Sequence, residues 1–291
     1  MKIGVLTSSR ADYGIYLPLL ERIKSDNFFT LEIIAFGAHL SNGHGFTIDD
    51  IERDSYDKIY KISSLLSNDD EQSISTSYGL TVLKFSEFWH TNRYDIVFCL
   101  GDRFEMSAAV QAGIPYNIKF AHIHGGETTM GAIDNVYRHQ ISLASKIHFT
   151  ATKEFSKRVY ELTNTNDFVY TVGSLSLNYI EKFRPIEKEK FFEKIDSNGQ
   201  EFALVTFHPE TINLESNRQF ANEMRIALSK ILQRFYLVIT MPNADTMGSI
   251  YRQEIEILKK MHPNKVFCIE NFGKENYFNA MYYSKILIGN T

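Results

Sequence analysis

The stretch MKIGVLTSSRADYG at residues 1–14 indicates the fold class, because an apolar strand-like run leads directly into small polar residues, Arg10 and a helix start. Two later stretches have the same form, IVFCLGDR at residues 96–103 and AHIHGGE at residues 121–127. Arg10 near a helix N-terminus offers a cation and backbone N–H groups to an anion, and the later stretches end in carboxylates and histidines suited to proton transfer. In an open parallel sheet such strand ends share one crevice, so the sequence predicts an anion-binding enzyme.

Further strand-like runs alternate with amphipathic helical stretches, which is the pattern of a doubly wound α/β protein. Helices are predicted around residues 16–23, where Pro18 is tolerable only in the first turn, at 69–89 and at 135–145. The predicted strands are Lys2–Leu6, Leu31–Phe36, Asp95–Leu100, Lys119–His124, Lys146–Ala151, Val169–Val172, Glu201–Phe207, Phe235–Thr240, Lys265–Glu270 and Lys285–Gly289.

A charged stretch that contains Pro185 and the turn residues DSNG at 196–199 separates two α/β series. We therefore expect a first Rossmann-like domain at residues 1–175, a linker at 176–200 and a second domain at 201–291. The second series stops directly after a strand, where an α/β unit enters its next helix. We expect this second domain to be incomplete.

The composition is that of a globular protein and excludes several classes of function. The 291 residues suffice for two domains, and a net charge of −4 without a block of Lys and Arg makes nucleic acid an unexpected partner. No apolar run approaches the roughly 18 residues of a membrane span, and no secretion signal precedes the first strand. Cys99 and Cys268 lie in apolar runs; a disulfide is the alternative to the buried reduced thiols that we expect in a cytoplasmic protein.

The polar motifs also have purely structural interpretations. Arg10 can be a surface residue beside a helix capped by Ser9 or Asp12, and Asp102 and Asp134 can both be N-caps. A cap at the carboxyl end of a strand still faces the crevice, so the two roles of Asp102 are compatible. No Gly-x-Gly-x-x-Gly and no P-loop follows the first strand, which argues against NAD and against ATP as a phosphate donor.

His122 and His124 have the period-2 spacing that places both side chains on one face of a strand. A metal site is the alternative interpretation, but it needs a further ligand nearby. The two glycines that follow predict a tight turn that brings Glu127 into the crevice. In the second series, FHPE at 207–210 again has a titratable residue directly after a strand. The turn residues of MPNAD at 241–245 and NFG at 271–273 follow the next two strands and suit contacts with a base and a ribose.

Together these motifs resemble the UDP-N-acetylglucosamine 2-epimerase family, and within it the hydrolysing branch that begins sialic acid and related nonulosonic acid synthesis. The resemblance spans the whole chain. It rests on TSSRADY at 7–13, LGDRFE at 100–105, HIHGGE at 122–127, ID at 133–134, RH at 138–139 and VTFHP at 205–209. There are two departures. The final IGNT at 288–291 resembles the opening of the family's diphosphate loop without its serines, and His124 stands where several members carry Glu.

The resemblance implies two Rossmann-like domains facing each other across a cleft, as in the GT-B glycosyltransferases, with a UDP- or GDP-sugar held mainly by the second domain. It also implies the reaction. The nucleotide leaves C1 as a proton is lost from C2, and water then adds to give free N-acetylmannosamine or a 2,4-diacetamido-6-deoxy relative. We also expect a homo-oligomer, either a dimer or a tetramer.

Roles are carried over by motif position. The expected catalytic residues are Asp102, Glu127, Asp134 and His208. The nucleotide and its diphosphate are expected to contact Arg10, His208, Asn243, Phe272, Asn290 and Thr291, and the sugar to contact His39, His124, Arg138 and His139. No Asp-x-Asp occurs in the sequence, so we expect neither a metal nor a cofactor. A GT-B glycosyltransferase and a non-enzymatic nucleotide-sugar-binding protein remain alternatives, and the choice of UDP or GDP and the sugar's C4 and C6 substituents stay open.

Overall fold

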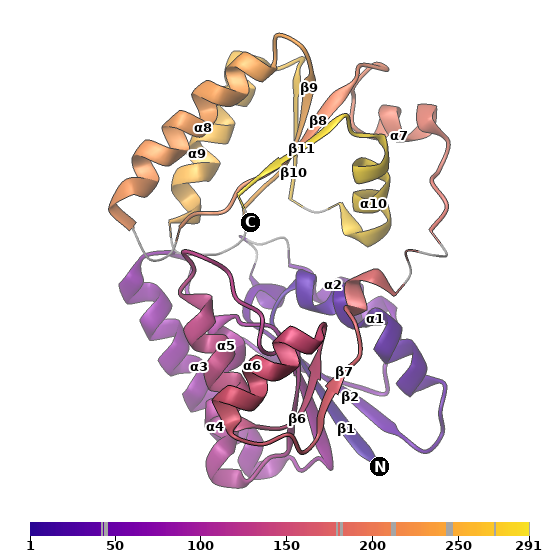
Figure 1. Cartoon of the computed structure of the whole chain (residues 1–291), viewed down its shortest axis with the longest axis vertical. Coiled ribbons are helices and arrows are strands. Elements are labelled where there is room, and N and C mark those ends of the chain that lie inside the picture. Colours follow the sequence, from indigo (N-terminus) through magenta and orange to yellow (C-terminus); the bar gives the residue numbers. More distant parts are fainter. Residues whose placement is uncertain are drawn as a thin grey trace. The chain divides into compact units, whose positions relative to one another are not determined.

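Figure 1 shows the computed structural model, which describes residues 1–41, 43, 46–178, 180, 183–210, 214–242, 247–270 and 272–290. The chain divides between Ile180 and Glu181 into two compact units. Each unit contains a parallel sheet with helices packed on both of its faces, as expected for two Rossmann-like domains. None of the described helices is long and apolar enough to cross a membrane.

The first unit is built on a parallel sheet whose seven described strands follow the order β3-β2-β1-β4-β5-β6-β7. The strands are β1 Lys2–Thr7, β2 Thr30–Phe36, β3 Lys58–Ile62, β4 Ile96–Leu100, β5 Phe120–Ile123, β6 Ser145–Thr150 and β7 Val169–Thr171. From β1 the chain first adds strands on one side, and from β4 onward it adds them on the other. The neighbours β1 and β4 therefore form the switch point at which open α/β sheets bind their ligands.

Helices cover both faces of this sheet (Figure 1). They are α1 Arg10–Lys24, α2 Ile48–Arg53, α3 Glu71–Thr91, α4 Phe104–Gly113, α5 Asp134–Ala144 and α6 Lys153–Thr163, with short 3-10 turns η1 Gly37–Leu40, η3 Ile114–Tyr116 and η4 Leu175–Leu177. Along β2, Ile33 packs with α1 and α2 in one core, and Ile34 packs with α3 and α4 in the other. Both residues are fully buried, which explains why this strand is apolar without alternation.

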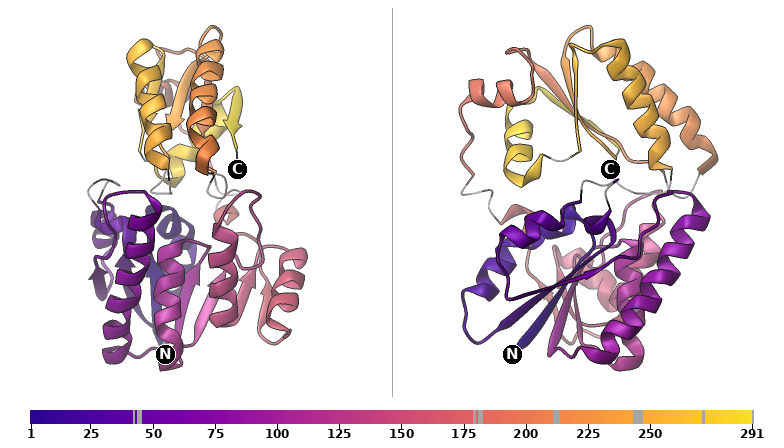
Figure 2. Two further views of the ribbon diagram at one scale, coloured as in Figure 1. Left: turned by 90° about the vertical axis from the view of Figure 1, so that its left-hand side faces the viewer. Right: turned by 180° about the vertical axis from the view of Figure 1, so that it is seen from behind.

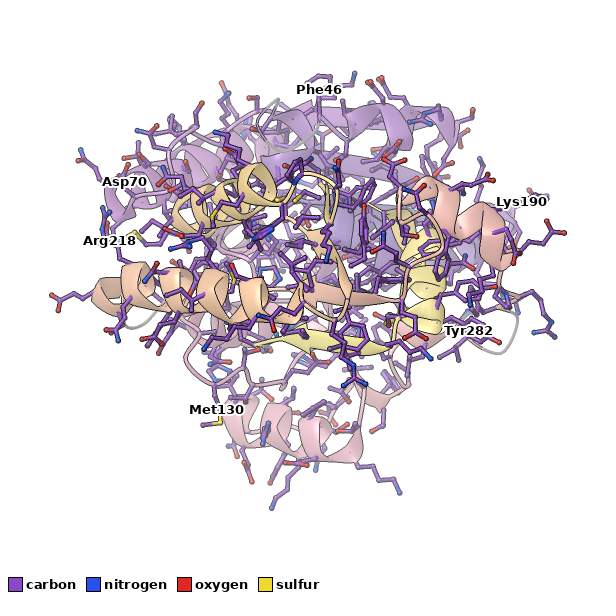
Figure 3. All side chains as sticks on the ribbon, turned by 90° about the horizontal axis from the view of Figure 1, so that it is seen from above. Phe46, Asp70, Met130, Lys190, Arg218 and Tyr282 are labelled. Carbon is purple, nitrogen blue, oxygen red and sulfur yellow. The ribbon has the colours of Figure 1, made fainter. Side chains whose placement is uncertain are left out.

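Local sequence accounts for most element boundaries, with two exceptions. Asp70, labelled in Figure 3, caps α3 by accepting a hydrogen bond from the Ser73 N–H at 2.8 Å. The edge strand β3 was not predicted, because KIYKI at 58–62 mixes charged and apolar residues. The expectation that Pro18 lies in a first turn is wrong: α1 begins at Arg10 and holds Pro18 in its interior. Burial of the proline ring offsets the helical hydrogen bond that proline cannot donate.

The second unit contains a parallel sheet with the order β10-β9-β8-β11 among its described strands. Its elements are α7 Lys188–Lys194, β8 Phe202–Thr206, η6 Leu214–Ser216, α8 Asn217–Ile231, β9 Tyr236–Thr240, α9 Gly248–Met261, β10 Val266–Ile269, α10 Gly273–Tyr283 and β11 Ile286–Gly289. Figure 2 shows α8 and α9 side by side on one face of this sheet, and α7 and α10 pack on the other.

Helix α7 falls inside the stretch 176–200 that the sequence marks as a linker. Phe191 and Ile195 are fully buried and pack with Phe202 and Tyr236 of the sheet. The Tyr236 hydroxyl also donates a hydrogen bond of 2.9 Å to the Ile195 carbonyl. This part of the stretch therefore belongs to the core of the second unit.

Two helical glycines provide a matched test of packing in the first unit. A Cβ added at Gly113 lies 2.5 Å from Cζ of the buried Phe120, whereas a Cβ at Gly79 in α3 meets nothing within 4 Å. We expect Gly113→Ala to lower the free energy of unfolding by about 1–3 kcal/mol through overpacking. Gly79→Ala should raise it by up to about 1 kcal/mol, because alanine favours the helix. Urea unfolding followed by fluorescence of Trp89, the one tryptophan of the chain, measures both; equal effects would contradict the close Gly113–Phe120 contact.

Candidate functional site

The predicted site residues of the first unit lie after the carboxyl ends of neighbouring strands. Arg10 begins α1 after β1, Asp102 follows β4, and Glu127 lies in the loop after β5. His39 lies in η1, directly after β2. These strands are adjacent around the switch point, so the sheet brings these segments to one edge.

The start of α1 shows the capping alternative that the sequence left open. Ser9 is the N-cap, and Asp12 forms a capping box with it. One oxygen of Asp12 accepts hydrogen bonds from Ser8 N at 3.0 Å, Ser8 Oγ at 2.7 Å and Ser9 N at 3.1 Å. The two backbone N–H groups nearest the strand end are therefore already bound to a carboxylate of the chain itself. Arg10 is half-buried at the first helical position, and its binding of an anion stays a prediction.

His39, predicted to contact the sugar, is fully buried. Its Nε2 lies 2.8 Å from Thr7 Oγ1, and its Nδ1 lies 2.8 Å from Thr47 Oγ1. Burial lowers the pKa of His39 to about 4, so the ring is neutral at ordinary pH. With both nitrogens engaged, His39 joins the end of β1 to the segment before α2 and presents no nitrogen to a sugar.

Arg138 of α5 connects the other predicted residues. Its guanidinium pairs with the Asp102 carboxylate, donates to the His124 carbonyl at 2.5 Å and lies 3.6 Å from Glu127 Oε2. Nδ1 of His124 lies 2.5 Å from Glu127 Oε1. We call these four residues, Asp102, His124, Glu127 and Arg138, the Arg138 cluster. It brings two of the three predicted catalytic carboxylates together.

The Arg138 cluster combines a buried cation with two partly exposed carboxylates. The Arg138 side chain is 6% exposed, whereas those of Asp102 and Glu127 are 25% and 27% exposed. Breaking a buried ion pair by removing one partner typically costs about 3–5 kcal/mol, and Asp102 is the nearer of the two carboxylates to the guanidinium. The buried Arg138 guanidinium thus binds both carboxylates, which remain partly open to solvent.

Asp134 and His139 lie on the same helix as Arg138. Asp134 is the first residue of α5, one helical turn before Arg138, and this spacing places the two on one face. His139 is half-buried, and its Nδ1 has no hydrogen-bond partner among the described residues. A direct contact between these side chains and a sugar stays a prediction.

The expectation that His122 and His124 share one face of a strand is wrong. Strand β5 ends at Ile123, and His124 takes the left-handed backbone conformation with φ 65°. His122 is buried and uses both nitrogens, with Nδ1 2.9 Å from Ser142 Oγ and Nε2 2.8 Å from the Gly101 carbonyl. In the described part of the chain, no group of three His, Cys, Asp or Glu side chains is arranged to hold a metal.

Sequence reasoning assigned no role to Arg103 and Glu105, which lie in the same loop and helix start as Asp102. Glu105 is fully buried, and its carboxylate lies 3.4 Å from the Arg103 guanidinium. Burial raises the pKa of Glu105 despite the nearby cation. The available signal was an acidic residue in the first turn of a helix that directly follows a strand end.

In the second unit the structure joins His208 to Asn290. The Asn290 side chain accepts from His208 N at 3.0 Å and donates to the His208 carbonyl at 2.7 Å, which connects the loops after the paired strands β8 and β11. Phe272 is the N-cap of α10, and its side chain is buried in the core with Phe191. Two further predicted nucleotide contacts, Asn243 and Thr291, lie outside the described residues.

His148 of β6 lies beside His122 in the sheet, and its burial predicts how the stability of the protein changes at acid pH. It is 1% exposed, and burial lowers its pKa to about 4. Its contribution to stability is complete above the unfolded value near 6.5 and is lost as the pH falls through about 4. Between pH 7.5 and pH 4, we expect the free energy of unfolding of the wild type to fall by about 3 kcal/mol more than that of His148→Leu. Urea unfolding followed by Trp89 fluorescence measures both. Parallel pH dependences of the two proteins would contradict a neutral buried His148.

Comparison with known proteins shows which family the chain matches. Residues 21–291 match the family described as UDP-N-acetylglucosamine 2-epimerase. The chain is 31% identical to a hydrolysing GDP/UDP-N,N'-diacetylbacillosamine 2-epimerase of Campylobacter jejuni, with 100% of this chain and 75% of that protein covered. It is 30% identical to a hydrolysing UDP-N,N'-diacetylbacillosamine 2-epimerase of Legionella pneumophila, which is covered to 76%, again with 100% of this chain covered.

Solved structures agree in fold. The UDP-GlcNAc 2-epimerase of Neisseria meningitidis, bound to UDP-GlcNAc, superimposes with a TM-score of 0.77 at 17% identity, covering 100% of this chain and 78% of that one. The Methanocaldococcus jannaschii UDP-GlcNAc 2-epimerase, in complex with UDP-GlcNAc and UDP, superimposes with a TM-score of 0.78 at 14% identity, covering 100% and 79%. At these identities the likeness concerns the fold alone.

Proposed function

The chain belongs to the UDP-N-acetylglucosamine 2-epimerase family, and we propose that it is a hydrolysing 2-epimerase of nucleotide-linked 2-acetamido sugars. The observation that carries this proposal is the Arg138 cluster, which presents two carboxylates at the carboxyl ends of adjacent strands. The two relatives with 31% and 30% identity bear the names of hydrolysing enzymes, which supports the same reaction here.

The reaction explains why such a site needs carboxylates and anion-binding groups. The C1–O bond to the diphosphate breaks and its electron pair leaves with the nucleotide, while a base takes the proton from C2 and a double bond forms between C1 and C2. Water then adds its oxygen to C1, and a proton returns to C2 on the opposite face. The products are the free nucleoside diphosphate and the free C2-epimeric sugar. The C2 hydrogen is weakly acidic, so departure of the diphosphate and proton removal must assist each other.

We assign the sugar side of the site to Asp102, Glu127 and Asp134, which stabilise the cationic character at C1 and exchange protons with C2 and water. Arg138 holds the first two of these carboxylates in place. Arg10 and His208 are assigned to the departing diphosphate, where a cation and a proton donor stabilise the developing charge. Asn290 supports His208 through two hydrogen bonds to its main chain. Asn243, Thr291 and the main chain of Phe272, whose side chain is buried in the core, complete the proposed nucleotide contacts.

The names of the relatives cover both UDP and GDP, so both nucleotides are proposed substrates to be compared. We further propose a cytoplasmic enzyme, since the thiol of Cys99 is free and buried in the core and such thiols persist in a reducing compartment. A homo-oligomer is proposed as well, and light scattering tests it.

Isotope incorporation tests the reaction itself. In D2O, incubation with UDP-N-acetylglucosamine or its 2,4-diacetamido-6-deoxy counterpart should release UDP and a free sugar that carries one deuterium at C2. No acceptor molecule should be needed, which distinguishes the reaction from glycosyl transfer. Nucleotide binding without product in D2O would favour a binding protein instead.

Amide substitutions test the assigned carboxylates. We expect Asp102→Asn, Glu127→Gln and Asp134→Asn each to lower kcat by about 10²-fold or more, because a lost acid or base group typically costs 10²–10⁴-fold. UDP affinity, measured by calorimetry, should change little, since the nucleotide is assigned to other residues. Near-normal turnover in all three variants would refute the site.

Chelation tests the proposed absence of metal from the chemistry. His122 has both nitrogens in hydrogen bonds and His124 uses Nδ1 toward Glu127, so the His-x-His pair has few donors to offer a cation. We expect activity to be unchanged after EDTA treatment and gel filtration. Activity that disappears with EDTA and returns with zinc or magnesium would overturn this prediction.

A further inference from the structure

The main chain of His124 adopts a conformation that L-residues rarely take. Its φ is 65°, in the left-handed region, which costs a non-glycine residue of order 1 kcal/mol or more. Two hydrogen bonds hold it there. Its N–H donates to the Phe149 carbonyl at 2.9 Å, and its carbonyl accepts from Arg138 at 2.5 Å. The strain is therefore maintained from both sides of the residue.

The two glycines after His124 prevent the turn from relaxing. A Cβ at Gly125 lies 3.1 Å from both His122 Nδ1 and Ser142 Oγ. Gly126 has φ 78°, and a Cβ there lies 2.2 Å from the Phe155 carbonyl oxygen of α6. A side chain at Gly126 would overlap the main chain of α6, and one at Gly125 would be tight against β5 and α5. This packing fixes the main chain directly after His124 and with it the direction of the His124 side chain.

That direction brings Nδ1 of His124 to 2.5 Å from Glu127 Oε1. The other ring nitrogen, Nε2, is buried and has no hydrogen-bond partner within the described residues. A ring with its proton on Nδ1 satisfies both observations: it donates to the carboxylate and leaves no N–H donor unsatisfied at Nε2. The His124 side chain is 11% exposed and that of Glu127 is 27% exposed, so a ligand reaches the carboxylate more readily than the imidazole.

We propose that His124 is a positioning residue that acts through Glu127, and not a direct sugar contact. The Nδ1–H group fixes Oε1 and stabilises the ionised carboxylate, which leaves Oε2, beside Arg138, as the oxygen that exchanges protons with the sugar. This inference rests on the proposed function and deepens it. It also gives a reason for the strained turn: an unstrained backbone at this position does not aim the ring at Glu127.

The chain offers variants that separate the donor from the strain. His124→Asn keeps a residue that tolerates the left-handed region, and its amide nitrogen replaces Nδ1 as donor. His124→Leu removes the donor and places an aliphatic residue at φ 65°. Asn117→Leu is the matched control, because Asn117 is exposed, lies outside the site and has φ 54°.

We expect His124→Leu to lower kcat by about 10–100-fold with KM changed by less than about 3-fold, whereas His124→Asn retains kcat within about 5-fold. Asn117→Leu should lose comparable stability and keep full activity. If His124→Leu does not fold, as judged by Trp89 fluorescence, His124→Gln takes its place, because its amide reaches the position of Nε2 and not of Nδ1.

The pH dependence of kcat provides a readout that a purely structural role would not move. Glu127 is faced by His124 from its own loop, by Arg138 from α5 and, through Arg138, by Asp102, while Arg158 of α6 binds the neighbouring Thr128 hydroxyl at 3.1 Å. Loss of the Nδ1–H donor makes the ionised carboxylate less favourable, so the acid limb should move to higher pH in His124→Leu. His124→Asn should restore it toward the wild-type position.

A double-mutant cycle with Glu127→Gln shows whether His124 acts through Glu127 or independently of it. If His124 acts through Glu127, the double variant His124→Leu/Glu127→Gln is no slower than Glu127→Gln alone. Losses that multiply, or a His124→Leu variant with wild-type kcat and pH profile, overturn the positioning role. A Glu127→Gln variant with normal kcat overturns the proposed function of Glu127 instead, so the two failures are distinguishable.

Discussion

The buried guanidinium of Arg138 is the contact on which the geometry of the first unit's site depends. Helix α5 carries it to the edge where the loops after β4 and β5 leave the sheet, and it binds the Asp102 carboxylate from one loop and the His124 carbonyl from the other. Since the side chain is 6% exposed, its charge has almost no access to water, and these acceptors provide the compensation that the solvent cannot. The two loops and the helix are therefore constrained to keep one arrangement.

A second, uncharged set of contacts connects the same three segments. His122 of β5 bonds through one nitrogen to Ser142 of α5 and through the other to the Gly101 carbonyl, beside Asp102. Burial lowers the pKa of His122 to about 3, so this set stays neutral while the Arg138 cluster carries the charge. The division suits a site that handles carbon-bound protons, because the negative charges lie on the two carboxylates that are partly open to solvent.

The histidines of the first unit show how far environment separates identical residue types. His39, His122 and His148 are buried, and burial lowers the pKa of each to about 4 or below, which suits them to structural roles and not to proton transfer. His124 is also buried, but the chain leaves β5 one residue before it and turns its ring toward Glu127. Nothing in the spacing of these residues distinguishes His124 from the other three, since its direction depends on the turn after β5.

The α/β class, ten of the described strands and the family could be predicted from the sequence alone, because apolar runs and short polar motifs are local signals. It also nominated Asp102 and Glu127, each after a predicted strand, and Arg138, by its motif, as site residues, and their roles stay predictions. The contacts of these residues follow from the tertiary structure. The hydrogen bonds of Asp12 to Ser8 and Ser9 are local capping contacts. The contact of His39 with Thr7, and the turn that separates the directions of His122 and His124, depend instead on packing between segments far apart in the chain. Local patterns carry strand and helix preferences, whereas burial, strain and hydrogen-bond partners arise when the sheet brings distant loops to one edge.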